Sequence, residues 1–200
     1  MAAQHLPAMR TSYSLDAATT ATQNTAVGSY AGSAATTASY STFIGKNAGD
    51  ALTTGNQNTA LGYSTLSASD DGNNNVAVGN AALGTGNCGD NNTAVGFNAL
   101  VATTSGYNTA VGAAAADALT DGERITAIGR DALGVAVSQD DCTAVGYASL
   151  DAATSGNQNT AVGSYSLSTT VDGANNSAFG YAALGNGNCG DDNTAIGQGA

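Results

Sequence analysis

A short motif with one large apolar residue returns along the chain at a nearly constant interval. Asparagine, threonine, alanine, an aliphatic residue and glycine follow one another, as in residues 58–62 (NTALG), and the intervening stretches are polar. The motif glycines stand 17 residues apart except for one step of 16, at positions 28, 45, 62, 79, 96, 112, 129, 146, 163, 180 and 197. A fixed short period of this kind is typical of a solenoid, in which one unit is copied along an axis and packs only on its neighbours.

Each motif predicts one short strand. Thr-Ala-Val is too short and too rich in β-branched residues for a helix, so we expect a strand of four or five residues. A leucine follows most motifs, and a second glycine ten residues after the first marks a turn. We therefore predict an all-β protein, a parallel β-solenoid of eleven coils of about 17 residues. The predicted rod covers residues 24–200, and residues 1–23 form an N-terminal cap or an attachment arm.

Alternation along a strand divides the motif between two faces. Threonine and the large aliphatic residue share one face, and we expect the aliphatic residue, such as Val145, to point into the core of its own coil. Asparagine, alanine and glycine share the other face. Alanine is kept at this position in ten of the eleven repeats, with Phe43 the exception. This constancy indicates that another chain, or another layer of the same coil, lies close against the face. We expect the asparagines to form a ladder of stacked amides between coils: Asn24, Asn58, Asn75, Asn92, Asn108, Asn159, Asn176 and Asn193.

The energetics of so narrow a coil favour a partner chain. Two large aliphatic side chains in each turn would stabilise it by roughly 3–6 kcal/mol, whereas ordering each residue costs about 1.5 kcal/mol. Hydrogen bonds between coils recover part of that difference. A single coil is then marginal, and we predict that the protein is a homo-oligomer, specifically a trimer.

The repeats resemble those of phage and algal-virus fibre proteins, most clearly in residues 142–150 (CTAVGYASL) and 176–184 (NSAFGYAAL). They are also similar to the left-handed β-roll head repeats of trimeric autotransporter adhesins, which carry Ala-Ile-Gly. The resemblance covers residues 24–200. It implies a non-enzymatic rod that serves as a spacer or a receptor-binding shaft.

Several features distinguish the chain from the adhesins. Residues 1–23 lack the apolar centre of a signal peptide, and no apolar run is long enough to cross a membrane. The membrane-anchoring barrel of the adhesins and the self-cleaving chaperone of many viral fibres have no counterpart in the sequence. We therefore expect a virion component that is made in the cytoplasm and is extracellular when mature, without membrane insertion. The last coil stops before its leucine, so we expect other virion or filament subunits to continue the stack at its uncapped C-terminal end.

No segment carries a recognisable catalytic or cofactor site. Residues 84–89 and 185–190 both match Gly-x-Gly-x-x-Gly, but no helix follows, as a nucleotide site requires, and both occupy the same turn of the repeat. No Ser/His/Asp set or buried carboxylate pair is visible, which predicts that the protein is not an enzyme and holds no cofactor. Four basic and 15 acidic residues, for a formal net charge of −11, make nucleic acid an improbable partner.

Neither a disulfide within the chain nor a metal site is expected. Cys88, Cys142 and Cys189 lie three coils apart, about 14 Å at the spacing of stacked strands, which is too far for a disulfide within one chain. The single histidine, His5, lies outside the repeats, so a Cys/His zinc site cannot form. Acidic residues in the turns could bind calcium, but aspartate is also a common turn former, and the calcium-binding nonapeptide pattern is missing. We predict no metal site.

Two side-chain columns suggest binding functions. Threonine stands before the motif alanine, or before Phe43 in one case, in nine repeats, an arrangement reminiscent of ice-binding solenoids, although those present two such columns and this chain has one. With the aliphatic residue on the same face and directed inward, however, the threonine hydroxyls are expected at the edge of the core. Aromatic residues near the motif glycine either cover the corner of each coil or hold a cell-surface glycan; they are Tyr30, Tyr63, Phe97, Tyr147, Tyr165 and Tyr181.

These observations favour three functions, in order. The first is a structural rod in a virion fibre, spike or decoration that contributes to host attachment. The second is a self-assembling extracellular filament or surface-layer protein. The third is an ice-binding solenoid.

Overall fold

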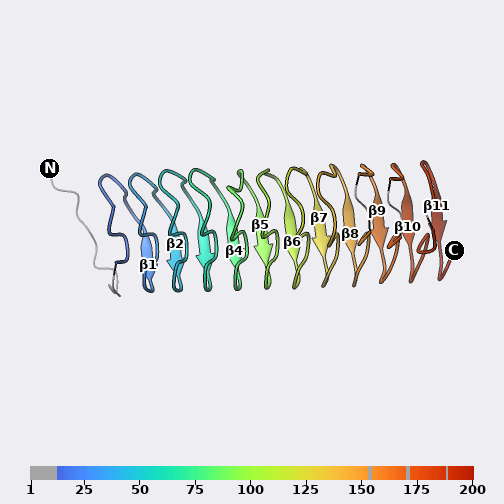
Figure 1. Ribbon diagram of the computed structural model, residues 1–200, viewed down its shortest axis with the longest axis horizontal. Helices are drawn as coiled ribbons and strands as arrows, with labels where there is room; N and C mark the ends of the chain where they lie inside the picture. The colour runs from blue at the N-terminus through green and yellow to red at the C-terminus, as the bar shows by residue number, and fades with distance from the viewer. Residues whose placement is uncertain (1–12, 153–154, 170–171, 188) are drawn as a thin grey trace.

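The computed structural model describes residues 13–152, 155–169, 172–187 and 189–200. Eleven parallel strands form one sheet in chain order, and about ten turns of the solenoid link them along a single axis (Figure 1). The all-β parallel solenoid is therefore confirmed, and the described residues contain no helix. The strands have three residues each, one fewer than the shortest expected. They are β1 Thr25–Val27, β2 Thr42–Ile44, β3 Thr59–Leu61, β4 Val76–Val78, β5 Thr93–Val95, β6 Thr109–Val111, β7 Thr126–Ile128, β8 Thr143–Val145, β9 Thr160–Val162, β10 Ser177–Phe179 and β11 Thr194–Ile196.

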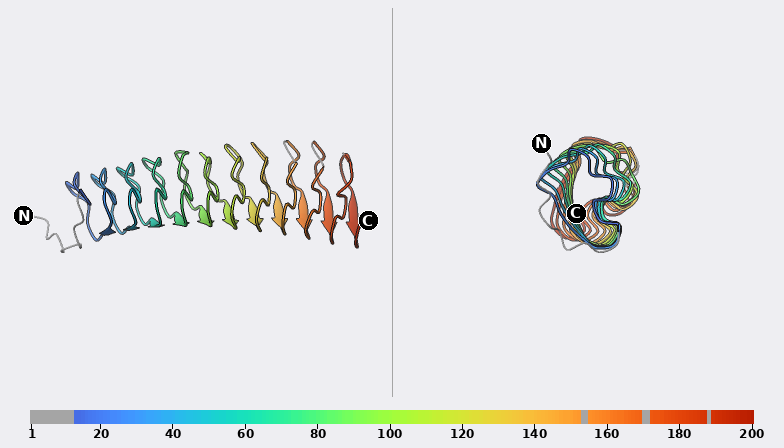
Figure 2. Two further views of the ribbon diagram at one scale, coloured as in Figure 1. Left: turned by 60° about the horizontal axis from the view of Figure 1, so that its bottom comes forward. Right: turned by 90° about the vertical axis from the view of Figure 1, so that its left-hand side faces the viewer.

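Every strand pairs with the next so that equivalent residues lie side by side. Thr143 pairs with Thr160, Ala144 with Ala161 and Val145 with Val162, and the same register holds for all ten pairs of strands. Backbone hydrogen bonds also join the turns outside the sheet. The coils therefore superpose around their whole circumference, as the view along the axis shows (Figure 2).

The assignment of the two strand faces from the sequence was wrong. In each strand the middle residue is buried and its two neighbours are exposed or half-buried. Alanine, asparagine and glycine therefore face the interior of the coil, and Val145 and its equivalents face outward together with threonine. The coil is too narrow for a large side chain opposite each leucine, so the small residue points inward. The sequence left two partners open for the alanine face, another chain or another layer of the same coil. The second of these is confirmed.

Leucine fills the interior that alanine leaves. Leu66, Leu83 and Leu100 have almost no exposed surface, as do Leu133, Leu150 and Leu167 in later turns. Each has a left-handed backbone, with φ of 50°, 51° and 48° for the first three, which bends the chain sharply after the strand. The sequence predicts two large aliphatic residues in the core of each turn. Of these two, the structure buries only the leucine.

The first turns fill the interior in a different way. Gly32 and Gly49 occupy the position of the leucine, so these turns lack its side chain. Phe43, the one large residue in the alanine column, lies fully buried between them. A Cβ added at either glycine would overlap the Phe43 ring. The phenylalanine therefore replaces the two missing leucines.

The motif glycines form a column in which no other residue fits. Gly96 has φ of +141°, a conformation that L-residues rarely adopt, and a Cβ on it would overlap the carbonyl oxygen of Gly112 in the next turn. The same overlap recurs from turn to turn. Close approach between coils is thus the reason for the glycine period that dominates the sequence.

Residues 13–22 pack on the first complete turn. Leu15 is buried and donates its backbone N–H to Ala31 O at 3.1 Å, as Leu66 does to Ala82 O at 3.0 Å later in the chain. Residues 1–12 of the predicted cap or attachment arm lie outside the described residues. The role of the segment stays a prediction.

Candidate functional site: the outward face of the sheet

The outward face is a continuous strip of threonine and large apolar residues. It consists of the first and third residues of β1 to β11, which we call the outward strip. Several of its apolar side chains are more than one-third exposed, including Ile44, Leu61, Ile128 and Phe179. Because the strands pair in register, the strip has one column of hydroxyl-bearing residues, broken only by Val76, and one column of apolar residues. This is a regular surface rather than a scatter of single exposed residues.

Charge is excluded from the outward strip. None of its 22 residues is charged, although the chain has a formal net charge of −11. The acidic residues instead lie in the turns. Two basic residues border the strip after the motif glycine, where Lys46 lies 5.9 Å from the centre of the Tyr63 ring and Arg130 lies 5.6 Å from that of Tyr147. The outward strip is therefore an uncharged surface on an acidic rod.

The threonine column does not lie where the sequence placed it. Thr25, Thr59 and Thr194 are exposed and the others are half-buried on the outward strip, with the aliphatic residues beside them. The prediction that an inward-pointing aliphatic residue keeps the threonine hydroxyls at the edge of the core is therefore wrong, although the strip still has a single threonine column. Threonine and aliphatic groups alternate outward instead.

The aromatic residues lie on the outside of the rod, not in its core. Tyr63, Phe97 and Tyr181 are more than half exposed, and Tyr30, Tyr147 and Tyr165 only slightly less. Tyr147, Tyr165 and Tyr181 contact one another across successive turns, and Tyr13 stacks on Tyr30. The rings therefore pack along the surface in groups.

The expected amide ladder is confirmed inside the coil. The Oδ1 atom of Asn75 accepts the N–H of Asn92 at 2.8 Å, and its Nδ2 donates to Gly89 O at 3.0 Å. Asn58 and Asn159 make equivalent bonds to the turns that follow them. Each amide thus satisfies one donor and one acceptor of the next turn, which links the coils through their buried side as well as through the sheet.

Smaller residues can continue this ladder, but an aliphatic residue cannot. The Ser41 hydroxyl accepts the N–H of Asn58 at 3.0 Å, and the Cys142 thiol accepts that of Asn159 at 3.5 Å. The Ile125 side chain has no polar atom and therefore accepts no hydrogen bond. The ladder therefore has one gap, between Ile125 and Cys142, which we call the ladder gap. Nearby, both amide atoms of the buried Gln139 lack a partner among the described residues.

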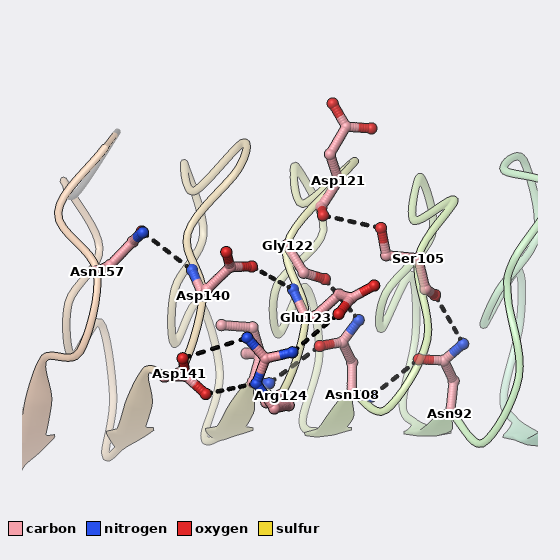
Figure 3. Close-up of polar contacts among 11 residues, drawn as sticks. Asn92, Ser105, Asn108, Asp121, Gly122, Glu123, Arg124, Asp140, Asp141 and Asn157 are labelled. Carbon is pink, nitrogen blue, oxygen red and sulfur yellow. Dashed lines mark hydrogen bonds and ion pairs between the residues drawn. The ribbon is translucent and has the colours of Figure 1, made fainter.

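Polar contacts nearer the surface cross the ladder gap (Figure 3). Arg124 binds Asp141 in the next turn through two nitrogens, at 2.6 and 3.2 Å, and also Glu123 at 2.8 Å. The Asp140 carboxylate accepts the N–H of Glu123 at 2.9 Å. Arg124 lowers the pKa of Asp141, chiefly by hydrogen bonding. Ionic contacts therefore join the two turns where the interior amide is missing.

The remaining candidate groups assemble no site. Residues 84–89 form a turn between β4 and β5, with strand on either side. Cys88 and Cys142 are free thiols, and burial raises the pKa of each to about 11, so neither is a ready nucleophile. Among the described residues, no group of three or more His, Cys, Asp or Glu side chains could hold a metal ion. No described helix is long and apolar enough to span a membrane.

Comparison with known proteins adds no assignment. No family model matches the chain, and no curated protein or solved structure was found to match it.

Proposed function

We propose that the protein is a non-enzymatic structural rod whose outward strip packs against other copies of the chain in a trimer. In this proposal the rod is part of a virion fibre, spike or decoration and contributes to host attachment. The single observation that carries the structural role is the uncharged outward strip, which runs along all eleven strands. The viral context is supported by the resemblance of the repeats to those of viral fibres.

The extent of the outward strip fits an interface between copies. Eleven strands at a spacing of about 4.8 Å and a width of about 10 Å give roughly 500 Å² of surface. That is as large as the largest apolar patch of a typical monomer, which often has a function. Three strips that meet on one axis would remove about 1,500 Å² in total from water, about 500 Å² for each of the three pairs of chains.

Electrostatics favours the same face. Each chain has a formal net charge of −11, so copies repel one another when their acidic turns approach. Contact through the outward strip brings together a long surface without acidic residues and keeps the turns apart. A second copy is therefore the occupant that the charge distribution fits best.

Light scattering tests this proposal directly. The purified chain should have about three times the mass of a single 19.3 kDa chain. Leu61→Lys combined with Ile128→Lys should reduce the mass to that of one chain, because positive charges would then face their own copies. Tyr40→Lys combined with Tyr107→Lys adds the same charge at exposed sites outside the strip and should leave the mass unchanged. A wild-type monomer, or equal dissociation of both variants, would refute the proposed interface.

Ice binding is the second candidate, because threonine and aliphatic columns both face outward in register. A wild-type chain that remains a monomer and shows thermal hysteresis would favour it. Electron microscopy of the purified protein distinguishes the proposed rod from the remaining alternative, a filament. Discrete short rods are expected here, whereas unbounded fibres would favour a self-assembling filament.

A further inference from the structure

Exposed tyrosines from successive turns are in contact at two places on the rod. Tyr147, Tyr165 and Tyr181 follow β8, β9 and β10, and we call them the C-terminal tyrosine group. Their ring centres are 5.1 Å apart for the first pair and 6.0 Å for the second, with the rings almost perpendicular. Tyr13 and Tyr30 form an N-terminal pair, stacked at 5.1 Å with 11° between the ring planes.

These rings are accessible as well as close. The exposed fractions are 40%, 39% and 55% in the C-terminal group, and 58% and 43% for Tyr13 and Tyr30. Hydrogen bonding with Tyr147 raises the pKa of Tyr165. Exposed side chains rotate within nanoseconds, which allows the ring carbons next to the phenol oxygens of neighbouring rings to meet.

We propose that both groups are sites of oxidative phenol coupling, which joins successive turns of one chain through dityrosine. The oxidant is a haem peroxidase with hydrogen peroxide. It removes one electron from each of two phenols, and each phenolic proton passes to solvent. The two phenoxyl radicals form a carbon–carbon bond at positions ortho to their oxygens. Each ring then transfers its ortho hydrogen to solvent as a proton and regains one at oxygen, so two hydrogen atoms are lost and one peroxide becomes two waters.

The solenoid makes coupling within a chain faster than coupling between chains. Neighbouring turns hold the two rings at a fixed separation, which raises their effective concentration far above that of separate molecules. Cys88 and Cys142 are free thiols and cross-link no turns. A link between Tyr147 and Tyr165 would close a loop of one turn covalently and thereby restrict the unfolded chain, as a disulfide does.

The chain also contains its own controls. Tyr40 and Tyr107 are each 62% exposed, more than any ring of the two groups, and neither contacts another ring in the described chain. They should be oxidised as readily but have no partner in the same chain. The positions of the links therefore show whether the fold brings the coupled rings together or whether any exposed tyrosine reacts.

The test treats the dilute full-length protein with a haem peroxidase and hydrogen peroxide. Dityrosine fluorescence, intact mass and mapping of linked peptides are measured, both in buffer and in urea. We expect chains that migrate singly on a denaturing gel and lose two hydrogen atoms per link, with links at Tyr13–Tyr30 and within the C-terminal group. Tyr165→Phe, which retains the ring, should remove the C-terminal links and leave Tyr13–Tyr30 linked.

Three results would overturn the proposal. They are links no more frequent than those at Tyr40 and Tyr107, links found only between chains, and an equal yield from the urea-unfolded chain. Because the readout is the position of links within one chain, its failure would leave the proposed trimer and its scattering test unaffected.

Discussion

The turns that carry β3 to β6 and the turns that carry β7 and β8 are joined in different ways. From Asn58 to Asn108, each buried amide accepts an N–H and donates to a carbonyl of the following turn. Between Ile125 and Cys142 this interior link is missing, and the Arg124–Asp141 ion pair crosses the gap at the surface. Buried hydrogen bonds are insensitive to salt, whereas exposed ion pairs are screened and contribute little. We therefore expect the contact between the turns of β7 and β8 to be less stable than those between the turns of β3 to β6, although the backbone geometry is the same.

The largest effect is expected from a change that forces intact turns apart. Gly96→Ala places a Cβ against the Gly112 carbonyl at a left-handed position and should destabilise the fold by about 4 kcal/mol or more. Gly134, near the ladder gap, has no left-handed backbone, and a Cβ there would lie 2.6 Å from the movable Asp151 carboxylate. Gly134→Ala should therefore cost only about 0.5 kcal/mol. Urea denaturation of both variants checks this difference; equal losses would contradict it.

A second variant copies the ladder gap into the intact region. Asn75→Leu leaves the N–H of Asn92 buried without a partner, whereas Gly89 O keeps its bond from Asn92 Nδ2, and the change should cost about 1–3 kcal/mol. Amide exchange should accelerate most at Asn92. A loss confined to about 0.5 kcal/mol would show that the ladder contributes little and that the comparison of the two regions has no energetic basis.

The reverse change fills the gap. Ile125→Asn should give the Cys142 N–H an acceptor and the Gln139 carbonyl a donor, two bonds worth about 1 kcal/mol each. That gain offsets the roughly 2–3 kcal/mol lost with the buried isoleucine. Global stability should therefore change by about 1 kcal/mol or less, while exchange of the Cys142 amide becomes slower. Ile125→Val keeps the gap and should leave that amide fast; slow exchange in both would contradict the account.

The smallest effect concerns the ion pair. Because Arg124 holds the pKa of Asp141 below its ordinary value of 3.8, the pair stabilises the fold above that value. Its contribution is lost as the pH falls through the lowered pKa of Asp141. Glu123, Asp140 and Asp141 are the acidic groups around Arg124. Arg124→Gln should accelerate amide exchange in the turns of β7 and β8 at neutral pH and low salt, and make no difference at high salt. An unchanged exchange rate at low salt would show that the pair does not hold the gap.

Much of the fold could be predicted because its signals are periodic. Gly96 and its equivalents marked every turn, and the asparagines predicted a ladder that the structure contains. The faces of the strand could not be predicted from alternation alone, because alternation says which residues share a face but not which face is inside. Phe43 and Gly49 held the missing information: only a large residue opposite a missing leucine shows that the alanine column faces the core.

The candidate surface was missed for the same reason. Once Val162 and its equivalents are assigned to the core, no long apolar face is left for a partner. The ladder gap at Ile125 could have been found in the sequence as the one large aliphatic residue in the asparagine column. The Arg124–Asp141 pair, 17 residues apart, follows from the period as well.

Adjacent residues of β9 test the central claim, the orientation of the strands, most directly. The measurement is thermal unfolding of Ala161→Asp and Val162→Asp in the Leu61→Lys/Ile128→Lys background, in which association is expected to be abolished. Ala161→Asp buries an unpaired charge and should cost more than about 3 kcal/mol, whereas Val162→Asp places it on the outward strip and should change stability by about 1 kcal/mol or less. The opposite order, with Val162→Asp the more damaging change, would contradict the account.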